Sequence, residues 1–177
     1  DILIGGDGSD KLIGGNGNDT VSYALDTAGV TVNLRTGTGT DGSGATDTYV
    51  DIEDVLGSSS NDIIQGNIGD NILNGGIGID TVTYKNSTTA VSVSLATTAQ
   101  QNTGDGKDTL LNFENLEGSS QGDTLTGDDS INTIWGLAGN DTIDGGKGSD
   151  ELYGGSGNDT FIIKVGDGSD IIDGYEL

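Results

Sequence analysis

Apolar residues recur along the chain at intervals of nine, each after a stretch rich in glycine and aspartate. The interval is clearest in residues 136–162, which divide into GLAGNDTID, GGKGSDELY and GGSGNDTFI, with Ile143, Leu152 and Phe161 at the eighth position. The three residues around that position are too few for anything but a strand with one side chain turned inward. The pattern therefore predicts a six-residue turn and a short strand per unit, and eighteen residues per coil.

The same unit extends through most of the chain, which predicts an all-β fold: a parallel β-roll, or β-solenoid. Eleven complete nonapeptides have an apolar eighth residue; they begin at residues 5, 14, 57, 66, 75, 118, 127, 136, 145, 154 and 165. Two extra residues, Ile163 and Lys164, precede the last unit, so we expect a bulge or a change of path there. Asp1–Ile4 fit positions six to nine of an incomplete unit, so we expect the sequence to be a fragment of a longer protein.

A longer period of 61 residues is superimposed on the short one. Aligning residues 19–80 with 80–141 pairs Tyr23 with Tyr84, and Asp47 with Asp108. Each copy contains an insert of 34 residues. In the inserts, VTVNL and VSVSL alternate as half-buried strands do, whereas the polar runs 36–46 and 97–106 are typical of surface loops. We expect both inserts to continue the solenoid within a single domain, residues 1–177, divided into first repeats 1–22, insert 23–56, repeats 57–83, insert 84–117 and main array 118–177.

The ends of the inserts keep the nine-residue register although they lose its glycines. Counting back from Gly57 and Gly118 places Glu53 and Glu114 at position six. Two interpretations remain open for each glutamate. It is a structural residue bound to backbone amides, or it is a metal ligand facing Asn71 or Asn132 eighteen residues later.

Composition adds an electrostatic problem to this picture. The chain has 29 acidic and 6 basic residues, a formal charge of −23, and only 31% hydrophobic residues. Such a chain tends towards disorder unless something neutralises it, and divalent cations would do so. The acidity argues against nucleic-acid binding, and no apolar run is long enough for a membrane span. Without His or Cys we expect no catalytic residues here, so any catalysis would lie elsewhere in the parent protein.

Position six carries the chemistry of the predicted turns. Calcium takes roughly six to eight oxygen ligands from carboxylates and carbonyls. One turn offers about half of that number, and the same-side turn one coil later offers the rest. The predicted ligands are the carboxylates of Asp1, Asp10, Asp19, Asp62, Asp80, Asp123, Asp141, Asp150, Asp159 and Asp170, with the carbonyls of Gly5, Gly6, Gly8, Gly14, Gly15, Gly17, Gly136, Gly139, Gly145, Gly146, Gly148, Gly154, Gly155 and Gly157.

The predicted sites are not equivalent, and each has an alternative interpretation. Any one of these aspartates could instead cap backbone amides of its turn. Asn71 and Asn132 replace the carboxylate by a neutral amide, and the turns GSSSND, GSSQGD and GDDSIN lack the glycine at position four. We therefore expect weak or absent sites in the turns that follow the inserts, with lower occupancy at Asp62 and Asp123.

The nonapeptides of residues 136–162 resemble the G-G-x-G-x-D-x-U-x repeat of RTX, or haemolysin-type calcium-binding, domains. The resemblance implies a secreted bacterial protein that passes a type I secretion channel unfolded and folds outside the cell on binding several Ca²⁺ ions. The expected function is a calcium-binding structural module that supports secretion and stability of a larger secreted protein.

An alternative of another class is an extracellular module that binds carbohydrate or a surface, as in adhesins or polysaccharide-modifying enzymes. Lys85, Lys107, Lys147 and Lys164 are too scattered to form a basic face. Trp135 stands at position nine, where a partly exposed packing residue is favoured over a sugar platform. The coil left open at Asp1 also raises end-to-end self-association as an alternative.

Overall fold

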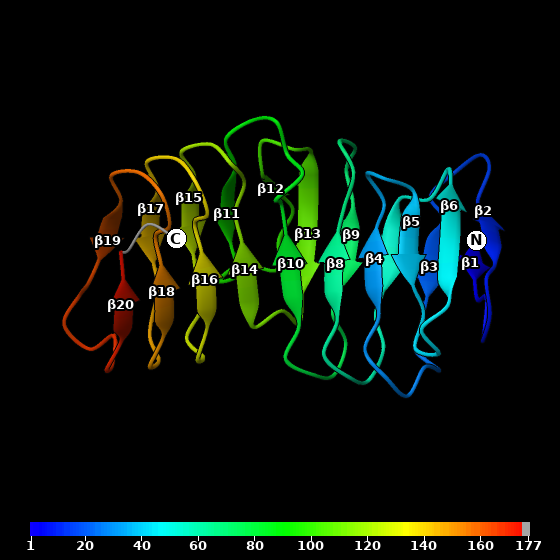
Figure 1. The fold of residues 1–177 in the computed structure, drawn as a ribbon, viewed down its shortest axis with the longest axis horizontal. Coiled ribbons are helices and arrows are strands. Elements are labelled where there is room, and N and C mark those ends of the chain that lie inside the picture. The colour runs from blue at the N-terminus through cyan, green and yellow to red at the C-terminus, as the bar shows by residue number, and fades with distance from the viewer. Residues whose placement is uncertain (175–177) are drawn as a thin grey trace. The chain divides into compact units, whose positions relative to one another are not determined.

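The computed structural model describes residues 1–174, which form strands and turns without any helix (Figure 1). The all-β prediction is confirmed. The strands fall into two compact units. Unit 1 comprises Asp1–Val82 and Gly106–Phe113, and unit 2 comprises Thr83–Asp105 and the chain from Glu114 onward. The proposal of one domain over the whole chain stays a prediction.

Unit 1 is built from two sheets that consecutive strands of the repeats enter in alternation (Figure 1). One sheet has the order β1-β3-β7-β9-β13 and the other β2-β6-β5-β4-β8-β10. The strands are β1 (Ile2–Leu3), β2 (Lys11–Ile13), β3 (Thr20–Ser22), β4 (Thr31–Asn33), β5 (Thr38–Thr40), β6 (Thr46–Val50), β7 (Asp54–Leu56), β8 (Ile63–Gln65), β9 (Ile72–Asn74), β10 (Thr81–Thr83) and β13 (Lys107–Leu111).

The strand register of unit 1 shows how the first insert continues the solenoid. Val21 on β3 pairs with Val55 on β7, which pairs in turn with Leu73 on β9. Val55 and Leu73 are one eighteen-residue coil apart, whereas the insert separates Val21 from Val55. The insert therefore takes the place of one enlarged coil, as predicted.

One strand in each insert departs from the prediction. In the second insert, the run 97–106 was expected to be a surface loop but contains β12 (Gln101–Asn102). The run 36–46 was expected to be a surface loop, but it contains β5, which pairs antiparallel with both β4 and β6. The absence of a side chain at Gly39 permits this pairing, because a Cβ there would overlap the Tyr49 hydroxyl. A polar composition misled the prediction, since the strand is held by a buried tyrosine and not by apolar side chains of its own.

That tyrosine belongs to a buried polar network in the insert. The Tyr23 hydroxyl donates a hydrogen bond to Asp47 Oδ2 (2.7 Å) and shares another with the Tyr49 hydroxyl (2.6 Å). Burial, reinforced by these hydrogen bonds and the Asp47 charge, raises the pKa of Tyr23 far above its ordinary value. Tyr23 is therefore a neutral core residue of the insert.

Unit 2 also has two sheets, with the orders β11-β15-β17-β19 and β14-β16-β18-β20. The pairs within both are parallel, and Leu116, Ile134 and Leu152 follow one another in register. Leu152 pairs with Ile172, so the two extra residues lengthen the last coil while the pairing continues. The strands are β11 (Ser92–Ser94), β12 (Gln101–Asn102), β14 (Asn115–Glu117), β15 (Thr124–Thr126), β16 (Thr133–Trp135), β17 (Thr142–Asp144), β18 (Glu151–Tyr153), β19 (Thr160–Ile162) and β20 (Ile171–Asp173).

Each unit has a thin core in which eighth-position side chains of the repeats are joined by apolar and tyrosine side chains of the inserts. Val21, Ile64 and Leu73 in unit 1 and Ile134 and Leu152 in unit 2 are fully buried. By contrast, Ile172 is 45% exposed, because β20 is the last strand of its sheet in the described chain. Residues 1–174 include no helix long and apolar enough to cross a membrane.

Candidate metal-binding turns

Hydrogen bonds connect the position-six aspartates of successive coils. The Asp123 N–H donates to Asp141 Oδ1 (2.7 Å), and the Asp141 N–H donates to Asp159 Oδ1 (3.0 Å). The Asp150 N–H reaches Asp170 Oδ1 in the same way (3.1 Å), across the longer last coil. The structure thus stacks these aspartates as predicted, and one oxygen of each accepting carboxylate caps an amide of the preceding coil.

The second oxygen of several of these carboxylates has a different environment. Oδ2 of Asp10, Asp19, Asp141 and Asp150 is buried and receives no hydrogen bond from any described residue. A buried charged oxygen without a donor is costly, and a bound cation is one of the few groups that would compensate it. Amide capping and metal binding are therefore compatible within one aspartate, because they use different oxygens.

The backbone of these turns explains why no donor reaches the second oxygen. In turn 145–150, Gly146 and Gly148 have positive φ angles of 87° and 132°, which favour glycine. The Gly146 N–H is directed to Asp144 Oδ1 (3.2 Å) and not to the aspartate at position six. We call turns with positive φ at positions two and four glycine turns; among the eleven nonapeptides they are 5–10, 14–19, 75–80, 136–141, 145–150, 154–159 and 165–170.

Four other turns have a second arrangement, in which the position-two N–H donates to the side chain at position six. Ser58 donates its N–H to Asp62 Oδ2 (2.6 Å) and its hydroxyl to Oδ1 (2.8 Å). Ser119 makes the same two bonds to Asp123, at 2.5 and 2.8 Å. We call these closed turns; they are 57–62, 66–71, 118–123 and 127–132.

The closed turns are the first two after each insert, where weak sites were predicted. In the two that carry asparagine, the side-chain amide also donates to the preceding coil: Asn71 Nδ2 to the Glu53 carbonyl (2.7 Å) and Asn132 Nδ2 to the Glu114 carbonyl (2.9 Å). Protein donors thus take the place that a cation would need. Weak calcium binding there stays a prediction, and this geometry gives it a physical basis.

Only two columns of the described chain place one complete glycine turn directly against another. Turn 136–141 faces 154–159, joined by a bridge between Ala138 and Ser156 and by the Ser156 N–H to the Leu137 carbonyl (2.8 Å). Turn 145–150 faces 165–170, joined by a bridge between Gly148 and Gly168. Elsewhere in residues 1–174 a glycine turn faces an insert, a closed turn or Asp1.

The glycine at position one brings oxygens together in these columns. A Cβ on Gly136 would overlap Asp141 Oδ2 and would lie 2.6 Å from the Gly154 carbonyl oxygen of the next coil. A Cβ on Gly145 would overlap Asp150 Oδ2 in the same way. The absence of a side chain therefore lets a carboxylate oxygen and a neighbouring carbonyl approach each other, which is the donor set that calcium takes.

Carbonyls would have to supply much of the coordination. Within residues 1–174 no three acidic side chains gather around one point. Coordination by one carboxylate and several backbone oxygens from each turn stays a prediction. It agrees with the glycine content of the turns, because a bare backbone exposes its carbonyls most readily.

The first column of unit 1 contains Asp1, Asp19 and Glu53, which are joined by hydrogen bonds. The Asp1 ammonium group donates to Asp19 Oδ1 (2.7 Å), while the Asp19 N–H donates to Glu53 Oε2 (2.9 Å). Glu53 therefore binds a backbone amide, the first of its two interpretations. Asp80 Oδ1 accepts the Asp62 N–H (2.8 Å) across one coil.

Two members of these columns were not predicted from the sequence. The Asp10 N–H donates to Asp47 Oδ1 (2.9 Å), and the Asn71 N–H donates to Asp108 Oδ1 (3.2 Å). Both acceptors lie inside inserts, where the nine-residue count fails. A signal was present, because Asp47 and Asp108 pair in the 61-residue alignment.

Burial and neighbouring charges shift the pKa values in the columns of unit 2. Burial raises the pKa of Asp141 to about 6; the hydrogen bond from Asp123 opposes this shift, and the Asp123 and Asp159 charges add to it. Burial also raises the pKa of Asp150, against its bond from Asn132 and with the help of the Asp170 charge. Without a cation, the ionised form of both carboxylates is therefore disfavoured.

These shifts predict two opposite effects of pH. The stability of the ion-free chain should fall as pH rises, whereas calcium binding should become stronger. The pKa of Asp141 is higher in the folded state than its ordinary 3.8, so its contribution to ion-free stability is present at low pH and is lost as pH rises through about 6. Calcium needs the ionised form. The calcium midpoint of folding should therefore rise as pH falls below 6, by up to about tenfold per pH unit for each proton displaced.

Calcium titrations followed by circular dichroism, at pH values between about 5 and 7.5, test this prediction. The matched control is Asp141→Asn, which keeps an amide-capping oxygen but cannot titrate, so its pH dependence should be shallower. A midpoint that does not change with pH in the wild-type chain would contradict the assignment of a titrating carboxylate.

Parallel coils and stacked, carboxylate-bearing glycine turns define a class of protein: a β-roll built from nonapeptide repeats. The family model of the RTX calcium-binding nonapeptide repeat (4 copies) matches residues 1–26, 51–82 and 126–161, more than half of the chain. The chain therefore belongs to this calcium-binding repeat family, as its turns had indicated. A search of curated proteins found no match.

Proposed function

We propose that the chain is a structural module that folds when several Ca²⁺ ions bind between its glycine turns, outside the cell, and thereby supports secretion and stability of a larger secreted protein. One observation carries the proposal: in four glycine turns, those of Asp10, Asp19, Asp141 and Asp150, a buried carboxylate oxygen receives no hydrogen bond from the described residues, and in turn 136–141 it lies close to a carbonyl of the next coil. Calcium matches that donor set in charge and in ligand type.

The strongest sites of the proposal are the two columns in which glycine turns face each other. Asp141 and Asp159 would hold one ion with carbonyls of turns 136–141 and 154–159, and Asp150 and Asp170 would hold another with carbonyls of turns 145–150 and 165–170. Asp10, Asp19 and Asp80 would form weaker sites, because each faces an insert or a closed turn.

The energetics favour folding that depends on calcium. The chain carries a charge of −23 around a core of one apolar side chain per strand, so its ion-free fold is poorly stabilised. An ion present at a hundred times its dissociation constant adds about 2.7 kcal/mol per site. Two such sites would supply about 5 kcal/mol, which is the scale of the whole stability of a small domain.

The location of folding follows from the same chemistry. Extracellular modules with oxygen ligands bind calcium with dissociation constants on the order of 0.1 to 1 mM, far above cytosolic concentrations. The chain would therefore stay unfolded inside the cell and fold after export. Its residues supply folding and rigidity, and the proposal assigns them no catalysis.

The closed turns provide a matched experiment. Asp150→Asn in a glycine turn and Asp123→Asn in a closed turn each retain the oxygen that accepts a backbone amide. In calorimetry and native mass spectrometry, Asp150→Asn should lose at least one bound calcium and raise the calcium midpoint of folding. Asp123→Asn should keep the wild-type number of ions and lose about 1.5 to 3 kcal/mol of stability, the value of a hydrogen bond to a charged group.

Two results would overturn this assignment. If Asp150→Asn binds as many ions as the wild type, the glycine turn is not a calcium site. If Asp123→Asn loses an ion as readily as Asp150→Asn, the distinction between glycine turns and closed turns does not govern calcium binding.

A further inference from the structure

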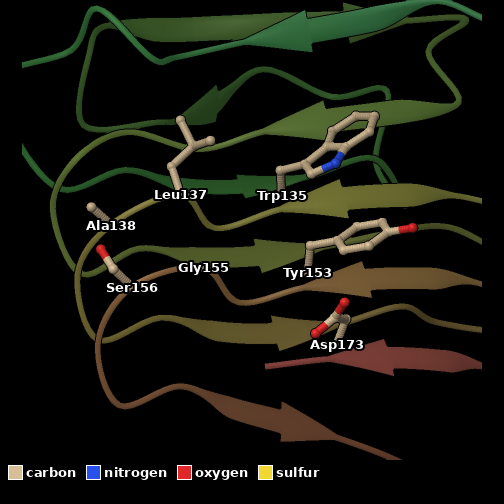
Figure 2. Close-up of a pocket in the computed structure, with 7 residues that line it drawn as sticks. All are labelled: Trp135, Leu137, Ala138, Tyr153, Gly155, Ser156 and Asp173. Atoms are coloured by element: carbon tan, nitrogen blue, oxygen red, sulfur yellow. The ribbon is translucent and has the colours of Figure 1, made fainter. Parts of the chain in front are cut away.

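Unit 2 has a hollow of about 440 Å³ on the outer side of β16, β18 and β20 (Figure 2). It lies between the ninth-position side chains of these strands and the turns that follow β16 and β18. Its volume is within the range of small-ligand pockets, about 300 to 1,000 Å³. The residues that line it are Trp135, Leu137, Ala138, Tyr153, Gly155, Ser156 and Asp173.

Two aromatic rings form the most apolar part of this hollow. Trp135 and Tyr153 are register partners on adjacent strands, and Figure 2 shows their rings projecting together on the same side. The ring planes differ by 10° and the centroids are 6.2 Å apart. The Tyr153 hydroxyl donates to Glu151 Oε2 (3.0 Å), which helps to fix the orientation of its ring. Tyr153 stands one coil after Trp135 at the same position nine, a signal in the sequence that the prediction for Trp135 did not include.

Polar groups flank the aromatic pair. Asp173 is the register partner of Tyr153 on β20, and Glu117 is the partner of Trp135 on β14. Ser156 adds a hydroxyl to the wall of the hollow. The site thus combines ring surface with a carboxylate acceptor and a hydroxyl. A pyranose offers the complementary surface, since its C–H groups pack on aromatic rings and its hydroxyls donate to carboxylates.

Charge narrows the class of ligand. No Lys or Arg is among the described residues that line the hollow, and the chain as a whole carries a charge of −23. Uronate sugars, phosphates and acidic peptides would be repelled by Asp173 and by this background. We propose that the hollow binds a neutral pyranose unit of an extracellular glycan. This site is separate from calcium binding, although it depends on the same fold.

The two activities are nevertheless connected through one turn. Leu137 and Ala138 line the hollow and belong to glycine turn 136–141, which is one half of a proposed calcium site. Glycan binding should therefore appear only in the folded, calcium-saturated chain. Circular dichroism in the same samples separates the two proposals, because it shows whether the chain is folded before any sugar is added.

Trp135 is the only tryptophan of the chain, so its fluorescence reports on the hollow directly. The calcium-saturated chain is titrated with cellotriose, mannotriose, β-1,4-galactotriose and chitotriose as neutral probes, and with trigalacturonate as an acidic one. At least one neutral trisaccharide should give a saturable change in Trp135 emission, confirmed by calorimetry, and trigalacturonate should give none. No saturable change with any neutral probe in a folded sample would overturn the proposal.

Variants then test the position of the site. Tyr153→Ala keeps the reporter and should weaken binding about tenfold, which is the scale of an aromatic contact. Ala138→Leu retains both rings and fills the hollow, so it should abolish binding even if Tyr153→Ala fails to fold. Thr142→Ala, on β17 in the other sheet, is the control and should bind as the wild type does. Wild-type affinity in a folded Ala138→Leu variant would overturn the assignment.

Discussion

Gly157→Ala is expected to destabilise the calcium-saturated chain by about 3 kcal/mol or more. Two effects combine at this position. The φ angle of Gly157 is +130°, a conformation that a residue with a side chain rarely adopts. A Cβ there would also overlap the Gly139 carbonyl of the preceding coil, which is backbone and cannot move without disturbing turn 136–141. Urea unfolding in saturating calcium measures the loss.

Gly8→Ala is the matched control for this prediction. Gly8 also stands at position four of a glycine turn, with a φ angle of +112°, but a Cβ there would meet nothing within 4 Å. It should cost only the conformational strain, about 1 to 2 kcal/mol. Equal losses at the two positions would show that close contact between coils does not constrain the turns.

Asp141→Ala is expected to remove about 4 kcal/mol of stability in saturating calcium. The variant leaves the buried Asp123 N–H without its acceptor, a cost of about 1 to 3 kcal/mol, and removes a carboxylate from the column of facing glycine turns. Loss of one well-occupied site adds about 2.7 kcal/mol. Unfolding by urea at matched calcium concentrations measures the sum.

The same variant should behave differently in excess chelator. Without calcium, burial already disfavours the ionised Asp141 carboxylate, so its removal relieves a penalty and offsets part of the lost hydrogen bond. The cost in chelator should therefore be clearly smaller than the cost in calcium. An equal cost under both conditions would mean that Asp141 is only an amide cap.

The strand positions could be predicted because each coil repeats the environment of the last. Once Leu152 was placed inward at position eight, Ile134 one coil earlier had to be inward too, and both are fully buried. The same argument placed Asp141 and Asp159 in one column. Periodicity is informative in a solenoid because contacts at a fixed sequence distance carry the whole fold.

The turn conformations could not be predicted from the repeat alone. Leu137 occupies position two of a glycine turn with a φ angle of +79°, which its residue type does not suggest, because neighbouring coils hold the conformation in place. The loss of glycine at position four was expected only to weaken the site in turn 57–62, whereas the N–H and hydroxyl of Ser58 at position two both bind the Asp62 carboxylate. Such choices depend on hydrogen bonds within and between turns, which a one-dimensional pattern does not contain.

The inserts show a further limit of periodicity. β5 pairs with β6 where Tyr49 packs over Gly39. This contact joins residues ten apart, a distance that does not recur in the repeats. The alternation in VTVNL was nevertheless sufficient to predict β4, since a half-buried strand keeps its own local period. Alternation of apolar and polar residues thus remained informative inside the inserts, whereas the polar composition of the run that contains β5 did not.

Far-UV circular dichroism of the purified chain during a calcium titration tests the central claim most directly, with magnesium as the control. If calcium folds the chain, the β signal should rise cooperatively between about 0.1 and 10 mM calcium. Magnesium should give no such rise, because it is smaller, requires near-octahedral geometry and releases its water reluctantly. A chain already folded in excess chelator, with a spectrum that calcium does not change, would contradict the account: glycine geometry and hydrogen bonds alone would then hold the turns.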